Sequence, residues 1–327
     1  MKLTKTKRLL TAALALPLLA LTACASNADP GGATAPAGTA GGGGGSKTIG
    51  LAVANLQADF FNQIRQSVEA AAADAGVSVV VADAGGDADK QVSQIQDLIT
   101  QQVDALIYIP AGATAATVPV REAQAANIPV VTVDRNPDGA PGDTFIATDS
   151  VGAAEVLGQW VVEQTGGEGK LAVIQGQIGT TPELARDEGF KKGIEGSSIE
   201  EVARQASQNW HQDEGFNIAQ DMLQANPEIN IFFGRADALA LGAAQAVRAA
   251  NAEDILIVGF DGDEAGLTAV RDGVIAATMT QKTQYMGQLA LESAIKLVDG
   301  ETLPTEQLQE AELTTKDNVE PFIEQHP

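Results

Sequence analysis

The sequence predicts an α/β fold built from two doubly wound parallel sheets. Short apolar runs typical of strands alternate with amphipathic segments typical of helices, and this alternation occurs twice along the chain. The two halves also match in detail, because VVTVDR in the first corresponds to IVGFDG in the second. Both motifs end an apolar strand with an aspartate, at the strand end where open α/β sheets bind ligands.

The first 46 residues lie outside the predicted fold. Residues 1–23 have a basic start and an apolar run too short to span a bilayer comfortably, and LTAC at their end resembles the bacterial lipobox. We therefore expect a signal peptide and a lipid on Cys24, the single cysteine of the chain. Residues 24–46 are rich in Gly, Ala and Thr and predict a flexible tether. The protein would then be extracytoplasmic and anchored to the cell membrane.

In the first half, strands are predicted from short β-branched runs: 48–54, 77–82, 105–109, 129–135 and 144–147. Helices are predicted where apolar residues recur at helical spacing: 60–75, 89–102 and an alanine-rich stretch ending at 126. Gly76 should stop the first of them. For the second helix, Val92, Ile95 and Ile99 predict the buried face.

The second half repeats this order. The predicted strands are 171–174, 199–206, 229–233, 255–260 and 274–279. The predicted helices are 151–164, 183–195, 213–225, 237–250, a short one after residue 260, and a last one at 286–298. Because both sheets are of one kind, Asp134 and Asp261 should lie on opposite walls of a single cleft.

Composition restricts the partners and the chemistry. A formal net charge of −23 disfavours nucleic acid and predicts a soluble, weakly self-associating monomer. The chain has two histidines, and a His-based nucleophilic or zinc site would depend on His211 alone. No Walker A, dinucleotide-binding or nucleophile-elbow motif follows a strand. We therefore expect no enzyme activity and no cofactor.

Two weaker interpretations concern the same acidic positions. The letters that begin at Asp134 match half of a calcium loop, but Phe145 occupies the place of the bidentate glutamate, so we expect a turn and no metal. Glycoside hydrolysis by Asp134 and Asp261 is the enzyme alternative. Nothing in the sequence raises either pKa, and Arg135 favours the ionised form of its neighbour.

From residue 47 to about 315 the chain resembles the ribose-binding type of periplasmic sugar-binding protein, the solute receptors of ABC importers. The resemblance rests on motifs in order: LAVANLQADFF, VVTVDR, FIATDS, ARDEGF, GRADALALGA, IVGFDGD and ATMTQ. It implies a type I periplasmic binding protein, whose two lobes are joined by a hinge of crossing strands. The lobes would close around one ligand and then dock on a membrane permease.

The resemblance also implies which residues touch the ligand. Hydroxyl groups would be bound by charged or amide side chains at Asp134, Arg135, Arg186, Asp261 and Gln281. Aromatic rings would line the pocket at Phe60, Phe61, Trp210 and Phe260; for Phe61 and Phe260 the alternative is plain core packing. Weaker candidates are Asn55, Asp59 and Asp237. Such a set suits a sugar, because aromatic faces bind its C–H surface and forked charged groups bind its hydroxyls.

Four positions depart from the family pattern. Ala54, Ala58 and Ala236 stand where the family carries polar side chains, and Trp210 replaces a smaller aromatic residue. Ribose is therefore in doubt, and a different pentose, a hexose or a polyol is equally open.

The expected lobes are 47–148 plus 282–309 and 149–281 plus 310–327. The expected partners are a small sugar or polyol and an ABC permease. The alternative function is a ligand sensor that presents its closed form to a membrane kinase or chemoreceptor.

Overall fold

The computed structural model describes residues 46–327. The predicted signal peptide, the lipid on Cys24 and the tether up to residue 45 lie outside the described residues. Among the helices of residues 46–327, none combines the length and the apolar character needed to cross a membrane.

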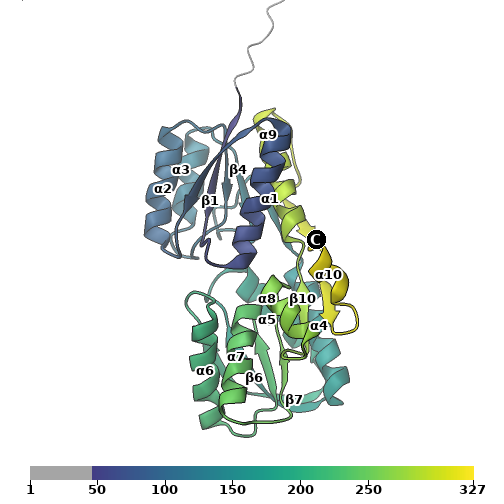
Figure 1. The fold of residues 1–327 in the computed structure, drawn as a ribbon. Helices are drawn as coiled ribbons and strands as arrows, with labels where there is room; N and C mark the ends of the chain where they lie inside the picture. Colours follow the sequence, from purple (N-terminus) through teal and green to yellow (C-terminus); the bar gives the residue numbers. More distant parts are fainter. Residues whose placement is uncertain (1–45) are drawn as a thin grey trace, which may run out of the picture. The chain divides into compact units, whose positions relative to one another are not determined.

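The first half of the fold is a six-stranded parallel sheet in the order β11-β5-β4-β3-β1-β2 (Figure 1). Its strands are β1 (Thr48–Val53), β2 (Ser78–Asp83), β3 (Ala105–Tyr108), β4 (Val130–Val133), β5 (Thr144–Thr148) and β11 (Glu306–Gln309). One face packs on α1 (Asp59–Ala75) and α9 (Thr283–Val298), and the other on α2 (Ala88–Thr100) and α3 (Thr117–Ala125). Each face has its own apolar core, as a doubly wound sheet requires.

The second half is another six-stranded sheet, in the order β12-β10-β9-β8-β6-β7. Its strands are β6 (Glu168–Gln175), β7 (Ser198–Ala206), β8 (Ile231–Gly234), β9 (Leu256–Val258), β10 (Ala277–Thr280) and β12 (Glu312–Thr315). All pair in parallel except β12, which runs antiparallel to β10. The predicted fold class is therefore confirmed, with one antiparallel edge strand that the pattern did not reveal.

Helices cover both faces of this second sheet. The pair α4 (Ser150–Thr165) and α5 (Thr181–Gly193) packs on one face. On the other lie α6 (Gln212–Ala225), α7 (Asp237–Ala249) and α8 (Glu264–Arg271). A short final helix, α10 (Glu320–Glu324), follows β12 and contacts α8. The sequence analysis did not predict α10, which at five residues is too short to have a clear period.

The chain passes from the first sheet to the second after β5, returns after β10, and crosses again between β11 and β12. Residues 46–327 thus contain two sheets joined by closely spaced crossing segments. In both sheets, the loops that follow the carboxyl ends of the strands face the same region, and the site lies there.

Two local details correct or support the sequence analysis. Helix α1 ends at Gly76, whose φ of 66° is the left-handed conformation that glycine adopts without strain. Helix α2 buries Gln91, Ile95 and Leu98, so Ile95 is buried as predicted, whereas Val92 and Ile99 are only partly buried. Gln91 lies on the buried face because its side-chain amide forms two buried hydrogen bonds. Its nitrogen donates to the Ile109 carbonyl and its oxygen accepts from the Ala111 N–H, and both of these residues follow the end of β3.

Candidate functional site

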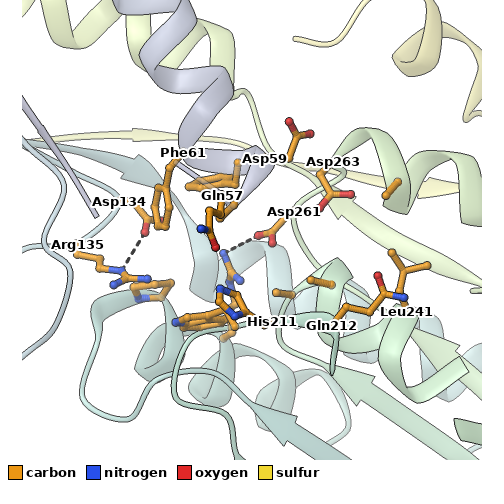
Figure 2. Close-up of a pocket in the computed structure, with 18 residues that line it drawn as sticks. Gln57, Asp59, Phe61, Asp134, Arg135, His211, Gln212, Leu241, Asp261 and Asp263 are labelled. Carbon is orange, nitrogen blue, oxygen red and sulfur yellow. Dashed lines mark ion pairs between the residues drawn. The ribbon is translucent and has the colours of Figure 1, made fainter. Parts of the chain in front are cut away.

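A cavity of ≈ 340 Å³ lies between the two sheets (Figure 2). Loops that follow β1 and β4 form one wall, and the start of α5 with the loops before α6, α7 and α8 forms the other. Eight of the predicted residues line it: Asp59, Phe60, Phe61, Asp134, Arg135, Arg186, Trp210 and Asp261. The structure thus brings together residues from both halves of the chain, at the position that a doubly wound sheet favours.

On the first wall, Asp134 and Arg135 follow directly from β4. Their side chains are almost fully buried, with 3.4 Å between the Arg135 Nε and an Asp134 carboxylate oxygen. The Arg135 Nη1 donates to the Pro110 carbonyl at 2.9 Å and to the Gln177 amide oxygen at 3.3 Å, which fixes the guanidinium. Apart from this pairing with Arg135, the Asp134 carboxylate has no side-chain hydrogen-bond partner among the described residues.

Burial dominates the electrostatics of this wall. It raises the pKa of Asp134, although the positive charges of Arg135 and Arg186 work in the opposite direction. Burial likewise lowers the pKa of Arg135, while the Asp134 carboxylate opposes that shift. A pair of this kind is costly to desolvate, so it is more typical of a binding site than of a stabilising surface pair.

On the second wall, Arg186 from α5 meets Asp261 from the loop after β9. The Arg186 Nη2 lies 3.1 Å from the Asp261 Oδ1, and Figure 2 shows this ion pair facing the cavity. Burial raises the pKa of Asp261 to about 7, despite the opposing charge of Arg186. The raised pKa values of Asp134 and Asp261 could not be predicted from the sequence, because burial is a property of the fold.

Three residues that line the cavity have backbone φ angles that are positive. The φ angles are 62° for Asp134, 63° for Trp210 and 132° for Asp261. Positive φ is rare for a residue with a Cβ, and for a bulky tryptophan it is a clear outlier. Strain of this kind costs about 1–3 kcal/mol per residue and gathers at functional sites.

Aromatic rings cover the guanidinium groups. The Arg135 guanidinium lies 5.2 Å from the Phe61 ring centre and 5.9 Å from that of Trp210. The Phe60 and Phe61 rings meet edge to face at 5.3 Å. The Trp210 indole packs closely on Gly176, where a Cβ would come within 1.8 Å of the ring. Cations are thereby held over aromatic faces in a partly dry cavity.

Four of the predicted residues do not line this cavity. Phe260 is fully buried beneath the Arg186 guanidinium, 3.9 Å from its ring centre. Gln281 is buried too, and its amide donates to Asp261 at 2.7 Å and accepts from the Thr148 hydroxyl at 2.6 Å. Both residues hold the second wall in place from behind, because their polar or aromatic groups are already engaged by protein.

Asp237 also lies away from the cavity. Its carboxylate is fully buried and accepts from the Gly262 N–H at 2.7 Å, the Asp263 N–H at 3.2 Å and the Thr278 hydroxyl at 2.6 Å. Burial, with the nearby Asp263 and Asp261, raises its pKa well above the ordinary value. Asp237 therefore holds the 261–263 loop and is not placed to contact a ligand.

Asn55 lies at the edge of the site, in a small adjoining cavity. Its side-chain oxygen accepts from the Gln57 N–H at 2.9 Å, and its nitrogen lies 3.3 Å from the His211 Nε2 on the opposite half. The arrangement makes Asn55 a contact between the two halves.

Four polar residues at the cavity were missed by the sequence analysis: Gln57, His211, Gln212 and Asp263. Figure 2 shows the Gln57 amide directed toward the centre of the cavity, on the side of Asp261. Each missed residue lies within two positions of one that was named, so the motifs indicated the loops but not which side chains point inward. On the basis of the sequence, His211 is considered only as a possible catalytic or zinc-binding residue and not as part of a ligand cavity.

A buried ion-pair network supports the second wall from behind. Arg235, at 1% exposure, donates to the Glu183 carboxylate at 2.8 Å and to Asp187 at 2.5 Å. The Arg186 Nη1 donates to the Arg235 carbonyl. The network thus links the strand end at β8 to α5, the helix that carries Arg186. Within residues 46–327, no group of three or more His, Cys, Asp or Glu is placed to hold a metal ion.

Comparison with known proteins extends these observations. A family model described as a periplasmic binding protein domain matches residues 49–302. The ribose import binding protein of Bacillus subtilis is 33% identical over 253 residues, which are 77% of this chain and 82% of the relative. The xylitol-binding protein of Mycolicibacterium smegmatis is 30% identical over 283 residues, covering 85% of this chain and 80% of the relative.

A solved structure gives a similar result. An ABC transporter solute binding protein from Bacillus halodurans, crystallised with bound myo-inositol, superposes with a TM-score of 0.82. It shares 27% sequence identity, and the match covers 86% of this chain and 99% of that protein. The similarity extends over both sheets, so it concerns the whole described fold.

Proposed function

The chain belongs to the periplasmic binding protein family, as a type I solute-binding protein of the kind that serves ABC importers, and on this premise we propose that it captures a small sugar or polyol and delivers it to an ABC permease. One observation carries the proposal: charged groups from both halves of the chain converge on one cavity that also has aromatic walls. Hydroxyl groups need both donors and acceptors, and the cavity supplies both.

Recognition would divide between the two walls. We assign the hydroxyl contacts to Asp134 and Arg135 on one side and to Arg186 and Asp261 on the other, with Trp210 and the Phe60–Phe61 pair against C–H surfaces. In support, the Nε of Arg186 and the Nε1 of Trp210 are buried without a hydrogen-bond partner in the described residues. A bound ligand or its ordered waters would satisfy donors of this kind.

Closure would occur by rotation of two lobes, 47–148 plus 282–309 and 149–281 plus 310–327, about the three crossing segments. In support, hydrogen bonds link the halves at the edge of the cavity: the Asn136 N–H donates to the Thr181 hydroxyl at 2.9 Å. Such contacts would form on closing and break on opening. They would also exclude water from the bound ligand.

The ligand class follows from what the cavity lacks as well as from what it holds. Ala58, Ala236, Ala238 and Leu241 line it and offer no side-chain polar group. Named relatives bind ribose or xylitol, and one structural neighbour holds myo-inositol. We propose that the ligand is a pentose, a hexose or a polyol, and that it makes fewer polar contacts with the second wall than ribose would make.

The remaining assignments follow from the family and the sequence. The family consists of solute receptors and not of enzymes, and we propose that this chain likewise performs no catalysis. We propose import over sensing, an extracytoplasmic location, a monomeric state without nucleic acid partners, and a lipid anchor on Cys24. Palmitate labelling that disappears in Cys24→Ala would support the anchor, and unchanged labelling would contradict it.

A thermal-shift screen tests the proposed function. Purified residues 47–327 should give a saturable rise in melting temperature with at least one member of a panel of pentoses, hexoses, inositols and linear polyols, because a ligand that binds the folded state stabilises it. Glycine betaine and amino acids serve as controls and should give none. A panel that produces no shift would contradict the proposal.

A further inference from the structure

The loop between β6 and α5, residues 176–181, reaches across to the first half of the fold. The Gln177 amide oxygen accepts from the Arg135 Nη1 at 3.3 Å, and the Thr181 hydroxyl meets the backbone of Asn136. Arg135 and Asn136 come directly after the end of β4 and its aspartate, and Thr181 begins α5. Both contacts therefore join the strand end of the first wall to the start of the helix that serves the second.

Two hydrogen bonds hold Thr181 to the backbone of Asn136. The Asn136 N–H donates to the Thr181 hydroxyl at 2.9 Å, and the same hydroxyl donates to the Asn136 carbonyl at 3.3 Å. A backbone N–H can only donate and a backbone carbonyl can only accept, so the direction of each bond is fixed by its partner. We call this pair of bonds the Thr181 latch. A hydroxyl group can make both bonds, whereas a methyl group can make neither.

Each side of the Thr181 latch is anchored within its own half. The Asn136 side-chain oxygen accepts from the hydroxyl of Thr132, a residue of β4, at 2.9 Å. On the other side, the buried Thr180 precedes the helix, and its hydroxyl donates to the Gln177 carbonyl at 2.8 Å. Because local bonds hold both partners, rotation of one half against the other has to break the latch.

The latch lies outside the ligand cavity, since neither Asn136 nor Thr181 lines it. Both residues line a second cavity of ≈ 370 Å³, and Arg135 lies between the two cavities because it lines both. The latch is nevertheless connected to the groups that face the ligand. Asn136 adjoins Arg135 in the sequence, and the helix that begins at Thr181 carries Arg186 in its second turn.

We propose that Thr181 is a positioning residue whose hydroxyl latches α5 to the strand end at β4 in the closed arrangement and so holds Arg135 and Arg186 in place across the cavity. This role rests on the proposed closure around a sugar or polyol. Because the latch makes no contact inside the ligand cavity, it stabilises the closed arrangement of the free chain as well.

The latch should act on ligand release and not on ligand entry. A bound ligand can leave only after the two halves separate, and their separation has to break both bonds of the latch. Entry takes place in the open arrangement, where the latch is absent, so the association rate does not depend on the hydroxyl. A residue that merely supported the fold would not separate the two rates in this way.

The first experiment measures the two halves without any ligand. Nitroxide labels are placed at two exposed positions, Asp97→Cys on α2 and Asp221→Cys on α6, in the full chain with Cys24→Ser. These helices contact the strands farthest from the crossing segments, so closure shortens the distance between the labels. Pulsed electron paramagnetic resonance gives the distance distribution. We expect the population at the shorter distance to be about threefold smaller in Thr181→Val than in the native chain.

Matched variants separate the hydroxyl from the rest of the side chain. Thr181→Ser keeps the hydroxyl and should give the native distribution. Thr181→Ala removes it without a branched side chain at the helix start and should behave like Thr181→Val. Thr165→Val is the control, because the Thr165 hydroxyl donates to the Val161 carbonyl within α4, and it should leave the distances unchanged. Circular dichroism establishes that each variant is folded.

The second experiment measures ligand release by stopped-flow tryptophan fluorescence. The probe is D-ribose, xylitol or myo-inositol, whichever gives the largest rise in the melting temperature of the native full chain. Thr181→Val should release this probe about threefold faster than the native chain, with an unchanged association rate. Thr181→Ser should have native rates in both directions.

Two results would overturn the proposal: equal populations at the shorter distance in the native chain and Thr181→Val, or a loss in Thr181→Ser as large as that in Thr181→Val. Because the distances come from the free chain, the two proposals can fail separately. A distance that depends on the hydroxyl, in a chain that binds none of the probes, would contradict the proposed function alone. Probe binding with equal distances in all variants would contradict the latch alone.

Discussion

The two walls of the cavity are built in different ways. The first wall depends on Asp134 and Arg135, which are neighbours in the sequence and are placed by the end of a single strand. The second depends on Arg186 and Asp261, which come from distant segments and meet only after folding. Buried residues support this ion pair. Asp237 accepts from the Gly262 N–H next to Asp261, Gln281 donates to Asp261 itself, and the Arg235 carbonyl accepts from Arg186.

The comparison shows that two similar ion pairs can need different amounts of supporting structure to hold their side chains in place. The first wall needs one strand and the hydrogen bonds of Arg135 to the Pro110 carbonyl and the Gln177 amide oxygen. The second needs a network of buried charges, each of which was costly to remove from water. We therefore expect the second wall to couple ligand binding to stability, and the first wall to affect binding with less effect on stability.

The largest expected effect tests the support behind the second wall. Arg235→Met should lower the free energy of unfolding by about 3–5 kcal/mol, because it leaves the buried Glu183 carboxylate without its cation. Urea denaturation measures the change. Arg271→Met is the matched control, since its ion pair with Asp272 is exposed to solvent and its loss should change the free energy of unfolding far less. Equal effects in the two variants would remove the distinction between the walls.

The next effect concerns pH. Burial raises the pKa of Asp261 to about 7 in the folded state, so between its ordinary value near 3.8 and pH 7 the folded protein holds a proton that the unfolded chain has lost. Stability should therefore fall as the pH rises through this window, by about 2 kcal/mol between pH 5 and pH 7. Chemical denaturation across that range should show the slope in the native protein and a reduced slope in Asp261→Asn. The exposed Asp97→Asn should keep the full slope.

The smallest effect tests the aromatic contact. Gly176→Ala forces Trp210 off the backbone, because the new Cβ would lie 1.8 Å from the indole. We expect about tenfold weaker binding of the sugar or polyol that gives the largest thermal shift, which corresponds to about 1.4 kcal/mol. Calorimetric titration measures it. Gly112→Ala is the control, since its Cβ would make an ordinary contact of 3.5 Å with Ala88, and comparable losses in both would argue against a role for the tryptophan.

The unequal construction of the walls also explains what the sequence could predict. Asp134 and Arg135 were found from one motif, since a strand end places its next residues directly. Asp261 was found in the same way, from the matching motif IVGFDG in the second half. Arg186 and Trp210 needed the family resemblance, because nothing local brings α5 and the loop before α6 to the loop after β9.

The roles of the buried residues could not be predicted. Asp237, Gln281 and Phe260 belong to the right segments, but whether a side chain faces the cavity or its supporting layer depends on tertiary packing. The same applies to the raised pKa of Asp261 and to Gln91 on the inner face of α2, since each results from groups far away in the sequence.

The central claim is that one small ligand contacts both walls at once. Calorimetric titration with the sugar or polyol from the thermal-shift panel tests it most directly, with Arg135→Met and Arg186→Met as single variants and as the double variant. We predict one site per chain, at least 100-fold weaker binding in each single variant, and a double variant whose loss is smaller than the sum of the two, because a ligand that cannot close the lobes no longer uses the remaining wall. Full binding in either single variant would contradict the account.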